Sequence, residues 1–172
     1  PRQDGQPNYL EVWVEKDALS GVLKRVTSKY HVPIMVNRGY SSVSAMYDAF
    51  MRFNINGFRE NKPIQVLYLG DFDPSGLDMI RDIRARVNEF ALGYYTDPEF
   101  YDFQFDVTPI ALTKEQIEAY SPPPNPAKIT DPRSKDFIKK HGTTSWEVDA
   151  LKPEVLDNLL EQAITSRIDI EL

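Results

Sequence analysis

The sequence of 172 residues contains no cysteine. This absence excludes disulfide scaffolds, thiolate zinc sites, iron–sulfur clusters and cysteine nucleophiles. The two histidines, His31 and His141, are isolated from each other, so neither is interpreted as a metal ligand. No apolar run approaches the ~20 residues that a membrane-spanning helix needs, and the polar residues 1–7 do not form a signal peptide. We therefore expect a cytoplasmic or nucleoid-associated protein that is neither secreted nor bound to a membrane.

Basic residues are outnumbered by acidic ones, 20 against 26, which gives a formal net charge of −6. Proteins that coat nucleic acids through phosphate contacts alone are usually basic. The charge balance therefore disfavours a simple DNA-coating protein, but it leaves open an acidic catalytic site flanked by local basic patches. The proportions of hydrophobic residues (41%) and charged residues (27%) are typical of a globular domain. The chain begins with Pro1, which suggests a fragment of a longer protein.

Strand and helix patterns alternate over the first two thirds of the chain. The apolar runs 9–14, 33–36 and 64–69 are typical of buried strands, and a further strand or strand pair is expected within 103–112. An amphipathic helical pattern follows each of the first three runs. The expected N-caps of these helices are Asp17, Ser41 or Ser42, and Asp73. The alternation predicts an α/β fold, with a central, mostly parallel sheet and helices on both faces.

The composition changes after Leu112. A short helix is expected at 114–120, and residues 121–145 are rich in proline without an apolar period, which predicts a long loop. The run 146–151 is interpreted as a strand, and a final amphipathic helix begins near Pro153. The predicted organisation has three parts: a flexible tail at 1–8, a core at 9–112, and a C-terminal extension at 113–172 that packs on the core.

Three acidic residues stand at the ends of predicted strands. Glu15 follows the first strand, and Asp71 and Asp73 follow the third. Ligands of parallel α/β sheets bind outside the carboxyl ends of the strands, so these carboxylates converge if the two strands are close together. Crowded carboxylates repel one another unless a cation is present, and oxygen ligands suit Mg²⁺, with Mn²⁺ as a substitute. The alternative is structural, since aspartates after strands often cap the next helix.

Three motifs follow one another in the same region: Val-Glu-Lys at 14–16, Asn-Arg-Gly-Tyr at 37–40, and Gly-Asp-Phe-Asp-Pro-Ser-Gly at 70–76. Together they resemble the Toprim domain, most closely that of the type IIB topoisomerase A subunit and its meiotic double-strand-break relatives. The resemblance covers residues 9–112 and implies a Toprim-like, Rossmann-like fold. The run 146–151 is also similar to a segment that follows Toprim cores in uncharacterised bacterial and phage proteins.

The resemblance also implies roles for individual residues. Glu15 would act as general acid or base in phosphodiester cleavage, and Lys16 would face a phosphate. Asp71 and Asp73, together with Glu15, would hold Mg²⁺. A carboxylic acid and a metal can share the work of protonating the leaving oxygen and stabilising the developing charge. The implied function is a Mg²⁺-dependent module that cleaves nucleic acid, expected to be DNA, as a nuclease or in topoisomerase-type strand scission.

The chain departs from the type IIB pattern because nothing in it resembles the winged-helix domain that carries their tyrosine nucleophile. Tyr40 and Tyr47 are interpreted as turn or packing residues. Either water is the nucleophile, or a winged-helix domain or subunit supplies it, and the relatives suggest a homodimer. One alternative is a non-catalytic module that binds metal and nucleic acid within a larger assembly. Another is a phosphatase with Asp71 as nucleophile, which leaves Glu15 unexplained.

Further candidates lie in the extension. Glu147 and Asp149 are two residues apart in a predicted strand, so they share a face and could add an acid to the metal site. The alternative is a solvated strand face. A basic stretch surrounds the proline-rich segment and consists of Lys128, Arg133, Lys135, Lys139 and Lys140. It could cover the rim of the site and meet a phosphate backbone, although loops are often charged simply because they are solvated. The residues singled out for phosphate contact are Arg38, Lys128 and Arg133.

Overall fold

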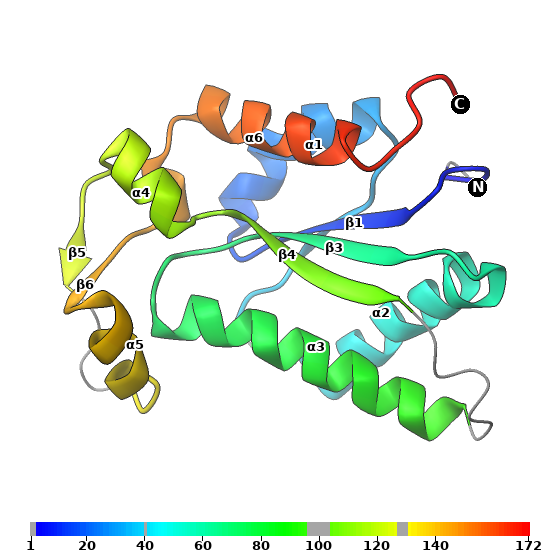
Figure 1. Ribbon diagram of the computed structural model, residues 1–172, viewed down its shortest axis with the longest axis horizontal. Coiled ribbons are helices and arrows are strands. Elements are labelled where there is room, and N and C mark those ends of the chain that lie inside the picture. Colours follow the sequence, from blue (N-terminus) through cyan, green and yellow to red (C-terminus); the bar gives the residue numbers. More distant parts are fainter. Residues whose placement is uncertain (1–2, 40, 96–103, 127–130) are drawn as a thin grey trace.

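A four-stranded, all-parallel sheet forms the centre of the structure, in the order β2-β1-β3-β4 (Figure 1). The computed structural model describes residues 3–39, 41–95, 104–126 and 131–172. The strands are β1 (Tyr9–Val14), β2 (Ile34–Val36), β3 (Ile64–Leu69) and β4 (Phe105–Ala111). The predicted α/β class is confirmed. The segment 103–112 contributes one strand, β4, within its described part.

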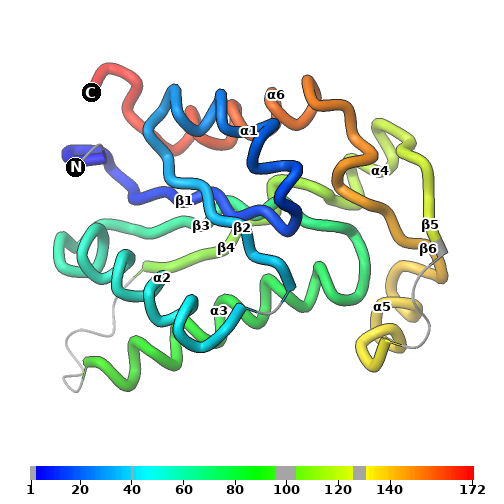
Figure 2. The backbone as a smooth tube through the Cα atoms, turned by 180° about the vertical axis from the view of Figure 1, so that it is seen from behind, coloured from blue at the N-terminus to red at the C-terminus, as the bar shows by residue number. Residues whose placement is uncertain are grey.

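Helices cover both faces of the sheet (Figures 1 and 2). The layer above the sheet in Figure 1 consists of α1 (Asp17–Lys29) and α6 (Pro153–Thr165). The layer below it consists of α2 (Val43–Asn56) and α3 (Pro74–Tyr94), and a short 3-10 turn, η1 (Phe58–Glu60), follows α2. No helix in the described ranges is long and apolar enough to cross a membrane.

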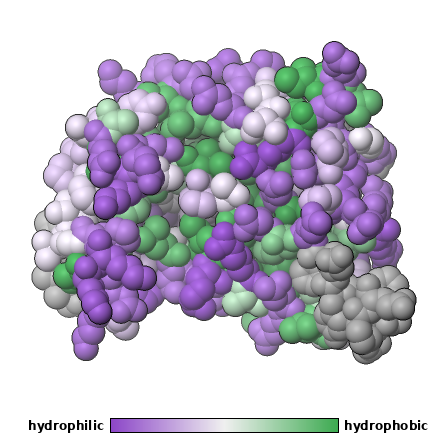
Figure 3. Space-filling model, viewed as in Figure 1, coloured by the Kyte–Doolittle hydropathy of each residue, from purple (hydrophilic) through white to green (hydrophobic). Residues whose placement is uncertain are grey.

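Alternating side chains of β1 supply two separate cores. Leu10, Val12 and Val14 are fully buried towards α1 and α6, whereas Tyr9 and Trp13 are buried towards α2 and α3. This alternation follows from the period of two in a strand, and because helices cover both faces of the sheet, every residue of β1 is buried. The outer surface of the helical layers is mostly hydrophilic (Figure 3).

Two of the three predicted helix caps are present. Ser42 accepts a hydrogen bond from the Ala45 N–H at 3.2 Å, and Asp73 accepts one from the Gly76 N–H at 2.6 Å. The prediction for Asp17 is wrong, because Lys16 is the N-cap and its side chain makes no capping bond. Asp17 lies in the first turn of α1, where a negative charge interacts favourably with the helix dipole.

The prediction of a loop throughout 121–145 is wrong. After α4 (Lys114–Tyr120), the described part of this segment contains β5 (Asn125–Pro126), α5 (Ser134–His141) and β6 (Thr144–Ser145). β5 and β6 pair antiparallel. Helix α5 buries only Ser134 and Phe137, so its apolar period is too short to recognise in the sequence. All of these elements lie beyond the carboxyl ends of the strands (Figure 1).

The predicted strand at 146–151 is also absent. Trp146 forms one isolated bridge with Phe72, and a 3-10 turn, η3 (Val148–Ala150), follows. Val148 and Leu151 are buried, and their spacing of three residues is that of a 3-10 turn rather than that of a strand. The alternating appearance of the sequence was therefore misleading.

The N-terminal segment makes specific contacts in its described part, although a flexible tail was expected. The Gln3 side chain donates to the Leu10 carbonyl at 2.9 Å and accepts from the Leu10 N–H at 2.8 Å. Gln6 exchanges hydrogen bonds with the backbone of Asp169. The two ends of the chain therefore lie side by side, at the right of Figure 1.

A charged side chain, Glu11, lies inside the core between the sheet and helices α2 and α3. Its exposed fraction is 1%, and it accepts hydrogen bonds from the Tyr9 hydroxyl (3.0 Å) and the Trp13 indole (2.9 Å). Arg52 on α2 donates to both of its oxygens, at 2.9 and 3.1 Å. A buried carboxylate needs this compensation, so Glu11 and Arg52 join β1 to α2 as an ion pair.

We expect Arg52→Met to lower the free energy of unfolding by about 3 kcal/mol, because the substitution leaves the buried Glu11 carboxylate without its cation. Urea denaturation measures the change. The control is Lys29→Met, which removes an exposed pair with Glu161 and should cost far less. Equal losses in the two variants would contradict a structural role for the Glu11–Arg52 pair.

Candidate functional site

The parallel register brings two of the predicted site residues into contact. β1 and β3 pair along their whole lengths, from Tyr9 opposite Ile64 to Val14 opposite Leu69. The residues that follow them therefore meet at the carboxyl end of the sheet. Glu15 Oε2 accepts a hydrogen bond from the Asp71 N–H at 2.9 Å.

The turn from Asp71 to Gly76 is tightly packed. Asp73 Oδ1 accepts from the Gly76 N–H and also from the Ser75 hydroxyl at 3.1 Å, so Asp73 caps α3 as well as lying beside the other acids. A Cβ atom at Gly76 would lie 2.1 Å from the Asp71 carbonyl oxygen. The turn therefore needs glycine at position 76 because the backbone of Asp71 passes so close to it.

Lys16 links the core acids to the extension. Its ammonium group lies 2.9 Å from Asp149 Oδ1 and 3.4 Å from both Glu147 Oε1 and Asp71 Oδ1. Glu147 and Asp149 therefore do reach the site through Lys16, but Glu147 lies just before a 3-10 turn and Asp149 lies within it. The Val148 N–H donates to Asp71 Oδ1 at 2.9 Å. This donor cannot be predicted from the sequence, because a backbone N–H leaves no signal there.

Burial changes the protonation of these acids. Burial raises the pKa of Glu15 to about 7, the charges of Asp71 and Asp73 add to the rise, and the Asp71 N–H and Lys16 oppose it. Burial also raises the pKa of Asp71, against the Val148 N–H and Lys16. Burial alone would lower the pKa of Lys16, but the hydrogen bond to Asp149 and the neighbouring negative charges raise it overall. Glu15 can therefore exchange a proton near neutral pH.

A pocket of about 260 Å³ lies where the core meets the extension. The core side is formed by the start of α3 together with Asp71 and Asp73, and the other side by residues of the extension. The extension residues that line the pocket are Asn125, Asp131, Ser145, Trp146 and Glu147. The pocket wall therefore carries several carboxylates, and an occupant with positive charge would suit it.

The donor set fits magnesium, because the side chains that meet here offer carboxylate oxygens. Within the described ranges, however, no three His, Asp or Glu side chains are placed to share one metal ion. Magnesium usually keeps several waters and uses only one or two protein carboxylates beside a phosphate. Asp71 and Asp73, which line the pocket, are therefore the candidate ligands, and Glu15 lies next to them.

The residues expected to contact phosphates are less available. Arg38 forms an ion pair with Asp17. Arg133 donates to both oxygens of Asp131, each at 2.7 Å. Lys128 lies outside the described residues, as does Tyr40. Arg38 and Arg133 thus already have acidic partners.

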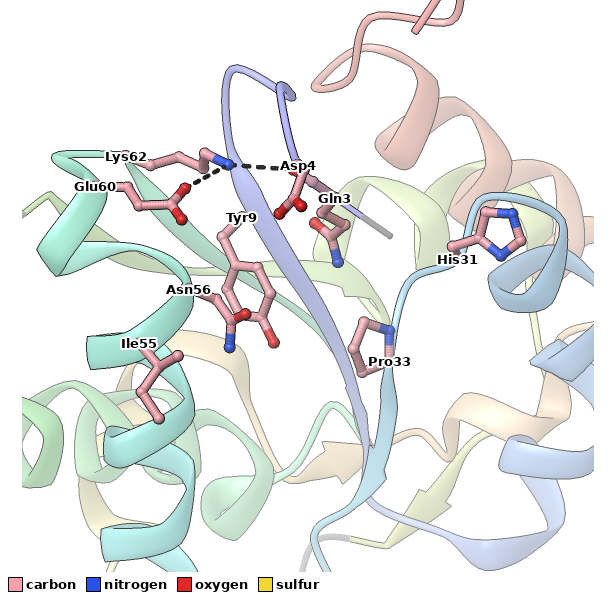
Figure 4. A pocket seen from close by; sticks show the side chains of 9 residues that line it. All are labelled: Gln3, Asp4, Tyr9, His31, Pro33, Ile55, Asn56, Glu60 and Lys62. Carbon is pink, nitrogen blue, oxygen red and sulfur yellow. Dashed lines mark hydrogen bonds and ion pairs between the residues drawn. The ribbon is translucent and has the colours of Figure 1, made fainter. Parts of the chain in front are cut away.

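A second pocket, of about 310 Å³, lies at the amino ends of the strands (Figure 4). Lys62 points across it and is bonded to the Gln3 carbonyl (3.1 Å) and to Glu60 (3.2 Å). The Tyr9 hydroxyl is bonded to Glu11. The main polar groups of this pocket are engaged with one another, and the acidic residues of the motifs lie at the other end of the sheet.

Comparisons with protein-family models, with curated proteins and with solved structures find no match for this chain. The class that the structure defines is an α/β protein with an all-parallel sheet and an acidic site at the carboxyl ends of its strands. The likeness to Toprim domains depends on the three sequence motifs.

We expect Gly76→Ala to destabilise the protein by about 2 kcal/mol, because the added methyl group overlaps the Asp71 carbonyl and displaces the turn. Thermal unfolding measures the change. Gly93→Ala in the same helix is the control: a Cβ there meets nothing within 4 Å. This control should stabilise by up to about 1 kcal/mol. If both glycines tolerate alanine, the turn is not as tight as described.

The pKa of Glu15 predicts a dependence of stability on pH. The folded state binds the Glu15 proton more tightly than the unfolded state, so this contribution is complete below about pH 4.5 and is lost as the pH rises through about 7. With a chelator present, the free energy of unfolding of Glu15→Gln should therefore exceed that of wild type above pH 7. The expected difference is about 1 to 2 kcal/mol, after allowance for solvent screening. The gap should close on acidification. A constant difference between pH 4 and pH 9 would contradict the raised pKa.

Proposed function

We propose that this chain is a Mg²⁺-dependent module of the Toprim type that acts on nucleic-acid phosphodiester bonds, with DNA as the expected substrate. The observation that carries the proposal is the contact between Glu15 and Asp71, beside Asp73, at the ends of neighbouring parallel strands. These are the positions to which the motifs assign a general acid or base and two metal ligands. The pocket beside them is lined by both aspartates.

Glu15 is the proposed general acid or base. Its Oε2 atom accepts the Asp71 N–H, which fixes the carboxyl group and leaves Oε1 to hold or release a proton. Scission requires a proton on the bridging oxygen as it leaves, and a group that titrates near neutral pH supplies one most effectively. A bound magnesium ion, held by Asp71 and Asp73, would stabilise the charge that develops on the phosphate.

Lys16 has a positioning role in this proposal. Its ammonium group is shared by Asp71, Glu147 and Asp149, so it neutralises part of the acidic site and holds the extension against the core. The nucleophile is water if the chain is a nuclease. A topoisomerase-type reaction would need a tyrosine from a separate winged-helix domain or subunit, and the type IIB relatives suggest that the chain would then act as a homodimer.

A non-catalytic module that binds metal and nucleic acid is the second candidate. The observation that favours it is the engagement of Asp71 Oδ1 by both Val148 and Lys16, which leaves fewer carboxylate oxygens for a metal. Such a module would bind Mg²⁺ and nucleic acid without turnover.

A cleavage assay on supercoiled plasmid with Mg²⁺ or Mn²⁺ tests the catalytic proposal. We expect wild type to nick or linearise the plasmid and Glu15→Gln to lose at least about 100-fold in rate, because the variant has no titratable group at this position. Glu89→Gln, at an exposed position on α3, is the matched control and should cleave like wild type. Cleavage by Glu15→Gln at the wild-type rate would contradict the role of Glu15 as general acid or base.

Thermal unfolding with and without Mg²⁺ separates the two candidates. Metal that binds only the folded state adds about 2.7 kcal/mol at a hundred times its dissociation constant. Stabilisation by Mg²⁺ without cleavage would support the non-catalytic module. If Mg²⁺ causes no stabilisation and the plasmid is not cleaved, both candidates are contradicted.

A further inference from the structure

Three lysines without acidic partners lie close together on α5. Lys135, Lys139 and Lys140 are exposed, and none forms an ion pair with a residue in the described ranges. Arg38 and Arg133, by contrast, are held by Asp17 and Asp131. In a chain with a net charge of −6, three neighbouring cations without partners form a local exception.

Helix stability explains only part of this pattern. Lys139 and Lys140 lie in the last turn of α5, where a positive charge interacts favourably with the helix dipole. Lys135 lies in the first turn, where the same dipole disfavours a positive charge. The helix also contains one acid, Asp136, yet neither Lys139 nor Lys140 is paired with it. The helix therefore keeps an exposed basic surface at some cost to itself.

Aromatic packing fixes α5 beside the candidate site. Phe72 stands between Asp71 and Asp73, and its ring packs against Phe137 (centroids 5.7 Å apart) and His141 (5.0 Å). Phe137 and His141 form the inner side of α5, and Lys135 and Lys139 project about 160° away from Phe137 around the helix. The same residue that separates the two aspartates thus holds the lysine-bearing helix in place.

A further lysine lies at the same end of the sheet. Lys114 begins α4 and forms no ion pair with a described residue. Burial lowers the pKa of His141, and the charges of Lys114 and Lys140 lower it further. Helices α4 and α5 both lie at the carboxyl end of the sheet (Figure 1).

We propose that the outer side of α5, with Lys135 and Lys139, binds the phosphate backbone of the nucleic acid and directs it to the acidic pocket. This inference rests on the proposed function and specifies its substrate contact. The pocket is lined by carboxylates and would repel a phosphate by itself, so a polyanion needs a basic surface next to it. Because the contact is with phosphates, it is independent of base sequence.

The test is the binding of fluorescein-labelled duplex DNA by the full chain, measured by anisotropy in EDTA at several salt concentrations. Each lost phosphate contact lowers the slope of log K against log salt by about 0.9 on duplex DNA. Lys135→Gln/Lys139→Gln should therefore lower the slope by about 1.8 and weaken binding by about 50-fold at about 0.1 M salt. Glutamine keeps the helix propensity, and the melting temperature checks the fold.

The matched control is Lys24→Gln/Arg59→Gln, which removes the same charge from α1 and η1, at exposed positions without ion pairs to described residues. We expect this control to bind like wild type. Equal weakening of both variants would reduce the effect to net charge and overturn the inference. If wild type binds and cleaves DNA and the α5 variant binds DNA as tightly as wild type, the inference is overturned but the proposed function is not. Failure of wild type to bind any DNA would overturn the proposed function as well.

Discussion

The parallel pairing of β1 with β3 decides where Glu15, Asp71 and Asp73 lie. Glu15 and Asp71 are far apart in the sequence, yet they follow neighbouring strands that end in register, so the carboxylate of one meets the N–H of the other. If β2 or β4 stood between β1 and β3, these groups would be separated by about 5 Å for each strand inserted. The two cores keep the pairing in place, because β1 and β3 are buried on both faces.

The concentration of negative charge at this end of the sheet must be balanced. Lys16 supplies one positive charge to Asp71, Glu147 and Asp149, and the Val148 N–H supplies a dipole. Burial and, to a smaller extent, the charges of Asp71 and Asp73 still raise the pKa of Glu15. An acid that titrates near neutral pH beside other carboxylates supports the proposed reaction, in which a cation and a phosphate arrive together.

The C-terminal extension is part of the site rather than an appendage. Helix α6 completes the layer above the sheet, and the segment before it brings Glu147 and Asp149 to Lys16. The bridge between Phe72 and Trp146 joins this segment to the turn that carries Asp71 and Asp73. Removing the extension would therefore expose the core between the sheet and helix α1, and it would remove one wall of the pocket.

The sequence by itself determined the alternation of strands and helices, the caps at Ser42 and Asp73, and the acids at the strand ends, because these depend on residue type and short spacing. It did not reveal α5 or the 3-10 turn at Val148, since each buries only a few residues against distant partners. Nor did it show which basic residues would be paired: Arg133 and Lys135 are close in sequence, yet only Arg133 has an ion-pair partner among the described residues. The tertiary structure alone decided these points, because burial and ion pairing depend on contacts between segments that only the fold brings together.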